Sequence, residues 1–178
     1  MVIKETSLSN VYLIEPKVFF DERGVFIKTF NETDFENCGI ESNFKESFYS
    51  ESKKNVIRGM HFQLPPHDQA KLVYVPYGII IDVVLDIRKS SPTYGESFSV
   101  ELSRENRKAV YIPPGFAHGF ASSSEDCIVV YMTTTTYQAE YDSGIRWDSF
   151  GYHWQINNPI ISKRDQSFIK FSEFESPF

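Results

Sequence analysis

Gly78-Ile-Ile-Ile-Asp-Val-Val-Leu-Asp-Ile87 is the longest apolar stretch of the chain, and its β-branched residues are typical of a strand. The stretch is too short to span a bilayer, and two aspartates interrupt it. On a strand, Asp82 and Asp86 point to the same face because side chains alternate with a period of two residues. This pattern fits a barrel with a polar pocket inside, and it equally fits an edge strand with one solvated face.

Many more strands are expected on both sides of this stretch. Each is short, rich in Val, Ile, Tyr, Phe or Thr, and bounded by Gly, Pro, Asn or Asp. The predicted strands are Val11–Phe20, Gly24–Phe30, Phe44–Ser50, Asn55–Gln63, Lys71–Tyr77, Ile79–Ile87, Glu96–Leu102, Lys108–Ile112, His118–Ser122 and Cys127–Thr136. Short strands at this spacing predict an all-β fold, either an antiparallel sandwich or a barrel.

Helical signals are few. A short helix is expected from Asn31 to Cys38, capped by Asn31 or Thr33 and ended by Gly39. A further turn is expected at Ser103–Arg107. The tail from about Asn157 lacks strand alternation, so we expect it to pack over the outside of a single domain covering residues 1–178.

The composition limits the partners of the protein. The chain has 178 residues and a formal net charge of -6, which argues against general binding to nucleic acid or to an anionic membrane. Cys38 and Cys127 share no motif spacing, and the N-terminal sequence has no apolar core of a signal peptide. We therefore expect a cytoplasmic protein with reduced thiols.

His61 is the histidine with the most suggestive company. A lone histidine on a strand is usually a satisfied core residue, but Arg58, Lys71 and Tyr131 lie on strands of the same kind. Arginine offers a planar fork for phosphate, and lysine can stabilise a developing oxyanion. Tyrosine can donate a proton, and histidine titrates near working pH. Together these residue types favour acid–base chemistry on an anionic substrate.

Pro113-x-Gly115-x-x-His118 resembles the second half-motif of the cupin superfamily, whose fold is a small jelly-roll barrel. In metal-binding cupins the first motif supplies a His-x-His pair, whereas this chain has His61-Phe-Gln63 at that position. Metal sites of this type need several converging ligands, so we expect a site without metal and without cofactor. A metal held by His61 and His118 is the alternative.

A more specific resemblance covers nearly the whole chain. The matching stretches occur in order at Asp21–Gly24, Asn55–Gln63, Ala70–Val75, Asp82–Gly95, Ile112–Phe120, Gly144–Asp148 and Pro159–Asp165. They resemble the signature of the dTDP-4-dehydrorhamnose 3,5-epimerase family. The resemblance implies a homodimeric jelly roll that acts on a nucleotide-linked 4-keto-6-deoxyhexose, in deoxysugar synthesis for surface polysaccharide such as O-antigen.

The resemblance also implies roles for four catalytic positions. A ketone at C4 acidifies the hydrogens on C3 and C5, so a base can remove one and an acid can return a proton to the opposite face. His61 matches the base and Asp165 the carboxylate that orients it. Tyr131 matches the acid, and Lys71 matches the group beside the enolate oxygen.

Further positions match substrate contacts, and several of them depart from the family pattern. Lys28 stands where Glu is common, Glu46-Ser47-Phe48 where Gln-Asp-Asn is common, Asp142 where Glu is common, and Arg164 where Lys is common. By the resemblance, Arg23 and Arg58 contact the diphosphate or the sugar, and Tyr137 stacks on the base. The expected substrate-binding residues are Arg23, Lys28, Glu46, Phe48, Arg58, His118, Tyr137, Asp142 and Arg164.

The departures at Lys28 and Glu46 bear on the nucleotide. Thymine presents an N3–H donor, whereas cytosine presents an N3 acceptor and an amino donor, so a Lys–Glu pair suits cytosine better. A CDP-linked substrate is therefore an alternative to a dTDP-linked one. In the competing interpretation, Lys28 and Glu46 form a surface ion pair that recognises nothing.

Three other functions remain open on the sequence alone. The same barrel can epimerise one carbon only or isomerise the keto group, and the orientation of Tyr131 would decide this. A non-catalytic carbohydrate-binding jelly roll would have no need for the set His61, Lys71, Tyr131 and Asp165. A metal-dependent cupin dioxygenase would contain metal after purification.

Overall fold

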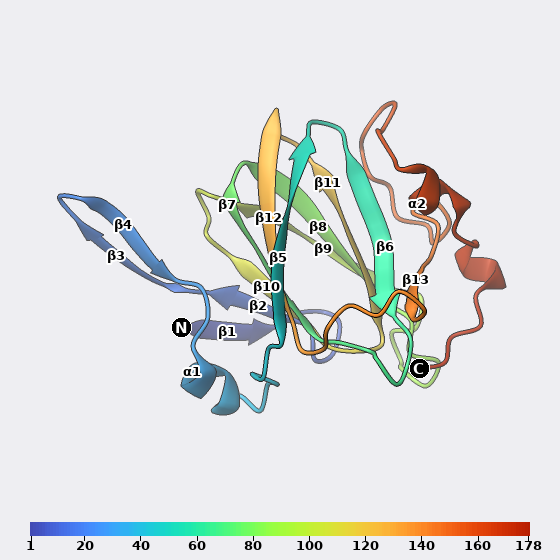
Figure 1. Cartoon of the computed structure of the whole chain (residues 1–178), viewed down its shortest axis with the longest axis horizontal. Coiled ribbons are helices and arrows are strands. Elements are labelled where there is room, and N and C mark those ends of the chain that lie inside the picture. Colours follow the sequence, from blue (N-terminus) through green and yellow to red (C-terminus); the bar gives the residue numbers. More distant parts are fainter.

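Two antiparallel sheets form the body of the computed structural model, which describes residues 1–178 (Figure 1). The first sheet contains, in spatial order, β1 (Val2–Glu5), β2 (Tyr12–Glu15), β10 (Ala109–Ile112), β7 (Lys71–Tyr77), β12 (Asp126–Thr133) and β5 (Glu46–Lys53). The second contains β13 (Asp142–Gly144), β6 (Ile57–Gln63), β11 (Phe116–Ser122), β8 (Ile79–Asp86) and β9 (Ser97–Ser103). The prediction of an all-β antiparallel barrel is confirmed, and its form is a cupin-type jelly roll.

The core has three parts: one on each face of the second sheet, and a third in which Ile14 and Leu72 of the first sheet pack with Phe35 of the short helix near Asn31. Val73 and Val110 of the first sheet pack against Val84 and Phe120 of the second, and all four are buried. On the outer face, Leu85 packs with Trp154 and other residues of the C-terminal segment. β8 is thus apolar on both faces, which explains its nearly continuous apolar sequence.

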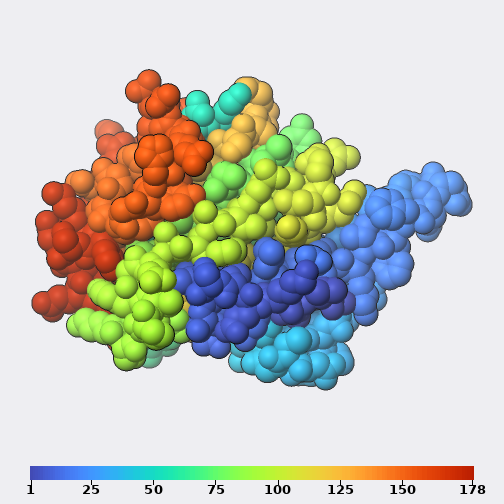
Figure 2. Space-filling view, turned by 180° about the vertical axis from the view of Figure 1, so that it is seen from behind, coloured from blue at the N-terminus to red at the C-terminus, as the bar shows by residue number.

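The C-terminal segment covers the outside of the second sheet, as expected from its lack of strand alternation (Figures 1 and 2). It contains the short helix α2 (Lys163–Ser167) and the 3₁₀ turn η1 (Phe171–Glu173), neither of which the sequence pattern predicted. Elements this short show no periodicity. No helix of the chain is long and apolar enough to cross a membrane.

The edge-strand interpretation of β8 is wrong. β8 pairs with β11 on one side and β9 on the other, and the side chains of Asp82 and Asp86 are fully buried. Asp86 accepts hydrogen bonds from Arg88, Ser91 and Thr93, which satisfies a carboxylate at the end of the barrel. Asp82 pairs with His118, which lines the polar pocket described below.

The expected strand Val11–Phe20 is divided at Pro16. β2 ends at Glu15 and β3 (Lys17–Asp21) begins after the proline, whose ring nitrogen has no hydrogen to donate to a sheet. β3 pairs only with β4 (Gly24–Lys28). This hairpin, called the arm below, projects from the barrel (Figures 1 and 2).

The short helix predicted near Asn31 is present as α1 (Glu32–Glu36). The Asn31 side chain accepts a hydrogen bond from the backbone N–H of Asp34, as an N-cap should. The turn expected at Ser103–Arg107 is also present, and the side chains of Ser103 and Asn106 each accept from the backbone N–H of the other. Two short strands, β1 and β13, were not predicted.

Candidate active site

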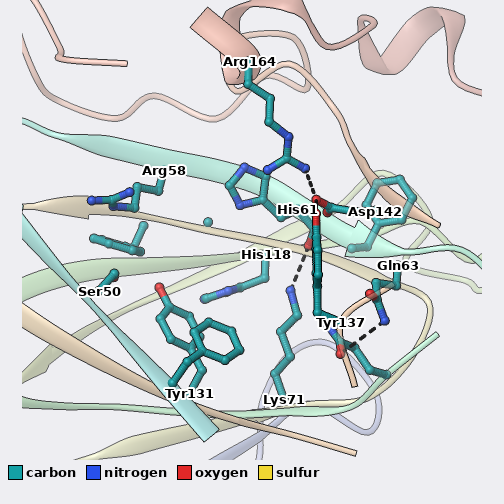
Figure 3. Close-up of a pocket in the computed structure, with 15 residues that line it drawn as sticks. Ser50, Arg58, His61, Gln63, Lys71, His118, Tyr131, Tyr137, Asp142 and Arg164 are labelled. Atoms are coloured by element: carbon teal, nitrogen blue, oxygen red, sulfur yellow. Dashed lines mark hydrogen bonds and ion pairs between the residues drawn. The ribbon is translucent and has the colours of Figure 1, made fainter. Parts of the chain in front are cut away.

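A pocket of about 270 Å³ opens at one end of the barrel, between the two sheets (Figure 3). Its walls come from β5, β6, β7, β11 and β12, and its rim comes from the segments around β13 and α2. Its lining residues are Phe48, Ser50, Arg58, His61, Phe62, Gln63, Gln69, Lys71, His118, Gly119, Phe120, Tyr131, Tyr137, Asp142 and Arg164. Most of these side chains are polar, so the pocket suits a polar ligand.

His61 faces this pocket and is held from behind by Asp165. The Nε2 atom of His61 lies 2.8 Å from Oδ1 of Asp165, and the other carboxylate oxygen accepts a hydrogen bond from Gly59 N–H at 3.1 Å. Asp165 lies in α2, and its backbone N–H donates to the side-chain hydroxyl of the N-cap residue Ser162. An ionised carboxylate accepts the Nε2 proton, so Nδ1 of the imidazole keeps its lone pair for another partner.

The surroundings of the pair favour a neutral imidazole beside a carboxylate. Burial lowers the pKa of His61, and Asp165 opposes this shift without cancelling it. Burial raises the pKa of Asp165, but the hydrogen bond and charge of His61 and the Gly59 N–H outweigh burial and hold the pKa below its usual range. At neutral pH, His61 is therefore able to accept a proton.

Gly59 lets β6 and β11 approach each other closely at this point. Its φ is +143°, and an added Cβ would lie 2.6 Å from the Cα atom of Gly119. No larger residue fits such an approach. The tight contact places His61 directly opposite His118 in the register of the two strands.

His118 forms a second histidine–carboxylate pair. Its Nε2 lies 2.7 Å from Oδ2 of Asp82, and both side chains are buried. The second oxygen of Asp82, Oδ1, is buried and has no hydrogen-bond partner within the chain. Each imidazole thus has one nitrogen committed to a carboxylate, and no group of three or more His, Cys, Asp or Glu side chains is arranged to hold a metal ion.

Lys71 supplies a buried ammonium group to the same pocket as His61 and His118 (Figure 3). Its Nζ donates to the backbone oxygen of His61 at 3.1 Å. Burial lowers the pKa of Lys71 to about 8, against the opposing charges of Asp142 and Asp82. The group stays mostly cationic at pH 7 and is poorly solvated, so it can bind an oxyanion strongly.

Tyr131 lies on the opposite wall from His61, because β12 and β6 belong to different sheets. Burial raises the pKa of the Tyr131 phenol far above its usual range. The Ser50 side chain lies close enough to the Tyr131 hydroxyl to lower this pKa, in opposition to burial, but the buried Ser50 hydroxyl has no partner in good hydrogen-bond geometry. Tyr131 is a neutral phenol whose proton is available to a ligand.

The rim of the pocket is tied together by Asp142. Its Oδ2 accepts from the Tyr137 hydroxyl at 3.1 Å and from Nη2 of Arg164 at 2.6 Å. The Glu46 carboxylate accepts the backbone N–H of Tyr137 at 2.7 Å. These contacts hold the exposed Tyr137 ring over the pocket mouth, where a flat ligand could stack on it.

Not all of the predicted site residues lie in this pocket. Arg58 lines it while bonded to Ser52 and to the backbone of Glu51. Arg23 and Lys28 lie on the arm and do not line the pocket of their own chain, and Arg23 is paired with Asp21 at the exposed tip. Lys28 forms no ion pair with Glu46, so the competing interpretation of a surface pair is wrong for the single chain.

Gln63 lines the pocket, but no role was predicted for it from the sequence. Its amide donates to the backbone oxygen of His67 at 2.7 Å and its oxygen accepts from Gln138 N–H at 2.7 Å. It therefore joins the loop after β6 to the loop that carries Tyr137. The sequence contained one signal for this role: Gln63 follows His61 by two residues on a strand, and alternation places both side chains on the same face.

The chain is similar over nearly its whole length to proteins of one family. A family model described as dTDP-4-dehydrorhamnose 3,5-epimerase matches residues 5–173. The chain belongs to the dTDP-4-dehydrorhamnose 3,5-epimerase family. The enzyme of that name from Methanothermobacter thermautotrophicus is 47% identical over 174 residues, which are 95% of this chain and 94% of that protein.

Solved structures of the epimerase family share the fold over the full chain. The crystal structure of dTDP-6-deoxy-D-glucose-3,5-epimerase from Legionella pneumophila, in complex with dTDP-4-keto-L-rhamnose, has a TM-score of 0.93 and 34% identity, covering 98% of this chain and 94% of that one. A 3'-monoepimerase from Streptomyces bikiniensis in complex with dTDP-quinovose has a TM-score of 0.88 and 27% identity, covering 94% and 86%. The epimerase fold therefore serves more than one stereochemical outcome.

Proposed function

We propose that the protein is a 3,5-epimerase of a nucleotide-diphospho-4-keto-6-deoxyhexose. The observation that carries this proposal is the placement of the His61 imidazole, backed by the Asp165 carboxylate, and the neutral Tyr131 phenol on opposite walls of a pocket that the Lys71 ammonium also lines. A base and an acid on opposite faces are what inversion of a carbon next to a ketone requires. A non-catalytic binding protein has no need for this set.

The reaction runs in the following steps. Nδ1 of His61 removes the hydrogen from a carbon next to the C4 ketone, and the electrons of the C–H bond form the enolate. Lys71 stabilises the enolate oxygen, with His118 beside it. Tyr131 then donates its proton to the opposite face of the carbon, and the resulting imidazolium and phenolate return to their neutral forms by proton exchange with solvent. The sequence repeats at the second carbon.

The nucleotide binds at the rim in this proposal. The base stacks on Tyr137, and the diphosphate lies against Arg58. The dTDP-linked sugar is the proposed substrate, in line with the names of the relatives. The CDP-linked analogue is the second candidate. Glu46, which departs from the family pattern, accepts the backbone N–H of Tyr137 and so lies beside the proposed binding position of the nucleobase.

Incubation of the purified protein with each 4-keto nucleotide sugar in deuterated water tests the function. Deuterium at both C3 and C5 with inversion is the expected result. Exchange at one carbon only would establish a single-carbon epimerase instead. A folded protein that exchanges neither carbon with either nucleotide would rule the proposal out, and equal kcat/KM for the two nucleotides would refute base selection by Lys28 and Glu46.

The active form is proposed to be a homodimer. The arm exposes Phe19, Phe20 and Phe26, which is unusual for a free surface, and its cations Arg23 and Lys28 match substrate contacts without lining their own pocket. Both facts are accounted for if the arm packs on a second copy and supplies its cations to that copy's pocket. A cytoplasmic location is proposed as well, since Cys38 and Cys127 are both free.

The change Phe26→Glu tests the dimer. It places a charge in the proposed apolar contact, so we expect the dimer Kd to rise by about tenfold or more, with a loss of activity at low protein concentration. Sedimentation velocity measures the association. Ile160→Glu, an equally exposed apolar position on the C-terminal segment, is the control and should leave the dimer intact. A Phe26→Glu protein that sediments as the wild type does would contradict the role of the arm.

A further inference from the structure

We propose that Phe48 is a positioning residue that sets the orientation of the Tyr131 ring for proton donation. The inference rests on the proposed function, because it concerns the acid of that reaction.

The register of two strands brings the rings together. Phe48 on β5 is directly opposite Tyr131 on β12, and both side chains face the pocket. The two rings are stacked, with centroids 4.8 Å apart and planes inclined by 16°. The Tyr131 ring also meets the His118 ring, but edge to face, with centroids 6.1 Å apart and planes inclined by 71°. Phe48 is thus the flat surface against which the Tyr131 ring lies.

Hydrogen bonding does little to fix the plane of the ring. The Ser50 side chain acts on the pKa of the Tyr131 hydroxyl, but the Ser50 hydroxyl is buried without a partner in good hydrogen-bond geometry. A phenol that is free to donate to substrate cannot also be anchored through its hydroxyl. The ring orientation is therefore fixed by packing, and stacking provides a preferred plane that an aliphatic neighbour does not.

The exposure of Phe48 is consistent with this role. Its side chain is 45% exposed, so it contributes less to the core than a buried aromatic would. Its neighbour Tyr49 is 65% exposed, points to the opposite face of β5 and does not line the pocket. Tyr49 is therefore a matched control on the same strand.

The experiment compares Phe48→Leu with Tyr49→Leu in deuterated water. Two rates are measured by NMR: deuterium entry into the recovered, non-inverted sugar, which reports proton removal by His61, and formation of the inverted product, which reports donation by Tyr131. For Phe48→Leu we expect about a 5- to 10-fold lower ratio of inversion to exchange. Both rates are measured at saturating substrate, so a change in substrate binding does not alter the ratio. Tyr49→Leu should match wild type, and Phe48→Tyr should restore the ratio.

A double variant separates positioning from general damage. With Tyr131→Phe the donor is absent, so adding Phe48→Leu should change the residual exchange rate by less than about twofold. Equal losses of exchange and inversion in Phe48→Leu, or a further multiplicative loss in the double variant, would overturn the inference. Wild-type protein that exchanges neither carbon would instead overturn the proposed function, and wild-type behaviour of Phe48→Leu would overturn the role of Phe48 alone.

Discussion

Replacement of His61 by alanine is expected to abolish deuterium exchange at both C3 and C5. The imidazole lines the pocket with a free ring nitrogen, and its other nitrogen is bonded to a carboxylate of lowered pKa. Removing a general base costs about 10²- to 10⁴-fold. We therefore expect a loss of at least about 10³-fold in the exchange rate, measured by NMR or mass spectrometry.

Asp165→Asn should give a loss of similar size without removing the imidazole. An amide cannot hold the Nε2 proton as a carboxylate does, so the ring loses both its tautomer and the stabilisation of its charged form. His153→Ala is the control, because His153 is exposed and lies outside the pocket. Exchange within about tenfold of wild type in His61→Ala would contradict the assignment of the base.

Replacement of Lys71 by methionine is expected to lower kcat/KM by about 10²- to 10³-fold, the effect of removing one oxyanion donor. Methionine matches the length of the buried stem but carries no charge. The change should also alter the pH profile. Because the pKa of Lys71 is lowered to about 8, the cation is present below this pH and lost above it, so wild-type activity should fall on the alkaline side near pH 8.

The acid side of the same profile belongs to His61. Burial lowers its pKa, and the base works when neutral, so activity should fall only below its ordinary value of about 6.5. The Lys71→Met protein should keep this acid limb and lose the alkaline one. Lys71→Arg, which stays charged throughout, is the matched control. An unchanged alkaline limb in Lys71→Met would show that another group titrates there.

Much of the fold and part of the site could be predicted from the sequence. Alternation and strand-forming residues located the long strands, because those features depend on nearby residues only. Whether Asp82 faces solvent or the interior depends on which strands pair with β8, and this pairing is set by contacts far along the chain. The division at Pro16 shows the same limit, since the separate direction of the arm is a tertiary property.

The catalytic set itself was accessible through motif resemblance rather than through spacing. Nothing in the local sequence links His61 to Asp165, and only the folded chain brings them to 2.8 Å. The hydrogen bonds at the rim could not be predicted from the sequence either. Glu46 and Gln63 accept them from the backbone N–H groups of Tyr137 and Gln138. The stack of Phe48 on Tyr131 requires the register of β5 and β12.

The large sequence separation between His61 and Asp165 has a consequence for folding during translation. The two residues are 104 positions apart, and Asp165 arrives on α2, which docks on the outside of the second sheet. During translation, the nascent barrel can close and expose its pocket while the imidazole still lacks its carboxylate. With the proposed roles of His61 and Asp165, we expect catalytic competence only after α2 has left the ribosome and docked, and we expect incomplete chains to lack turnover.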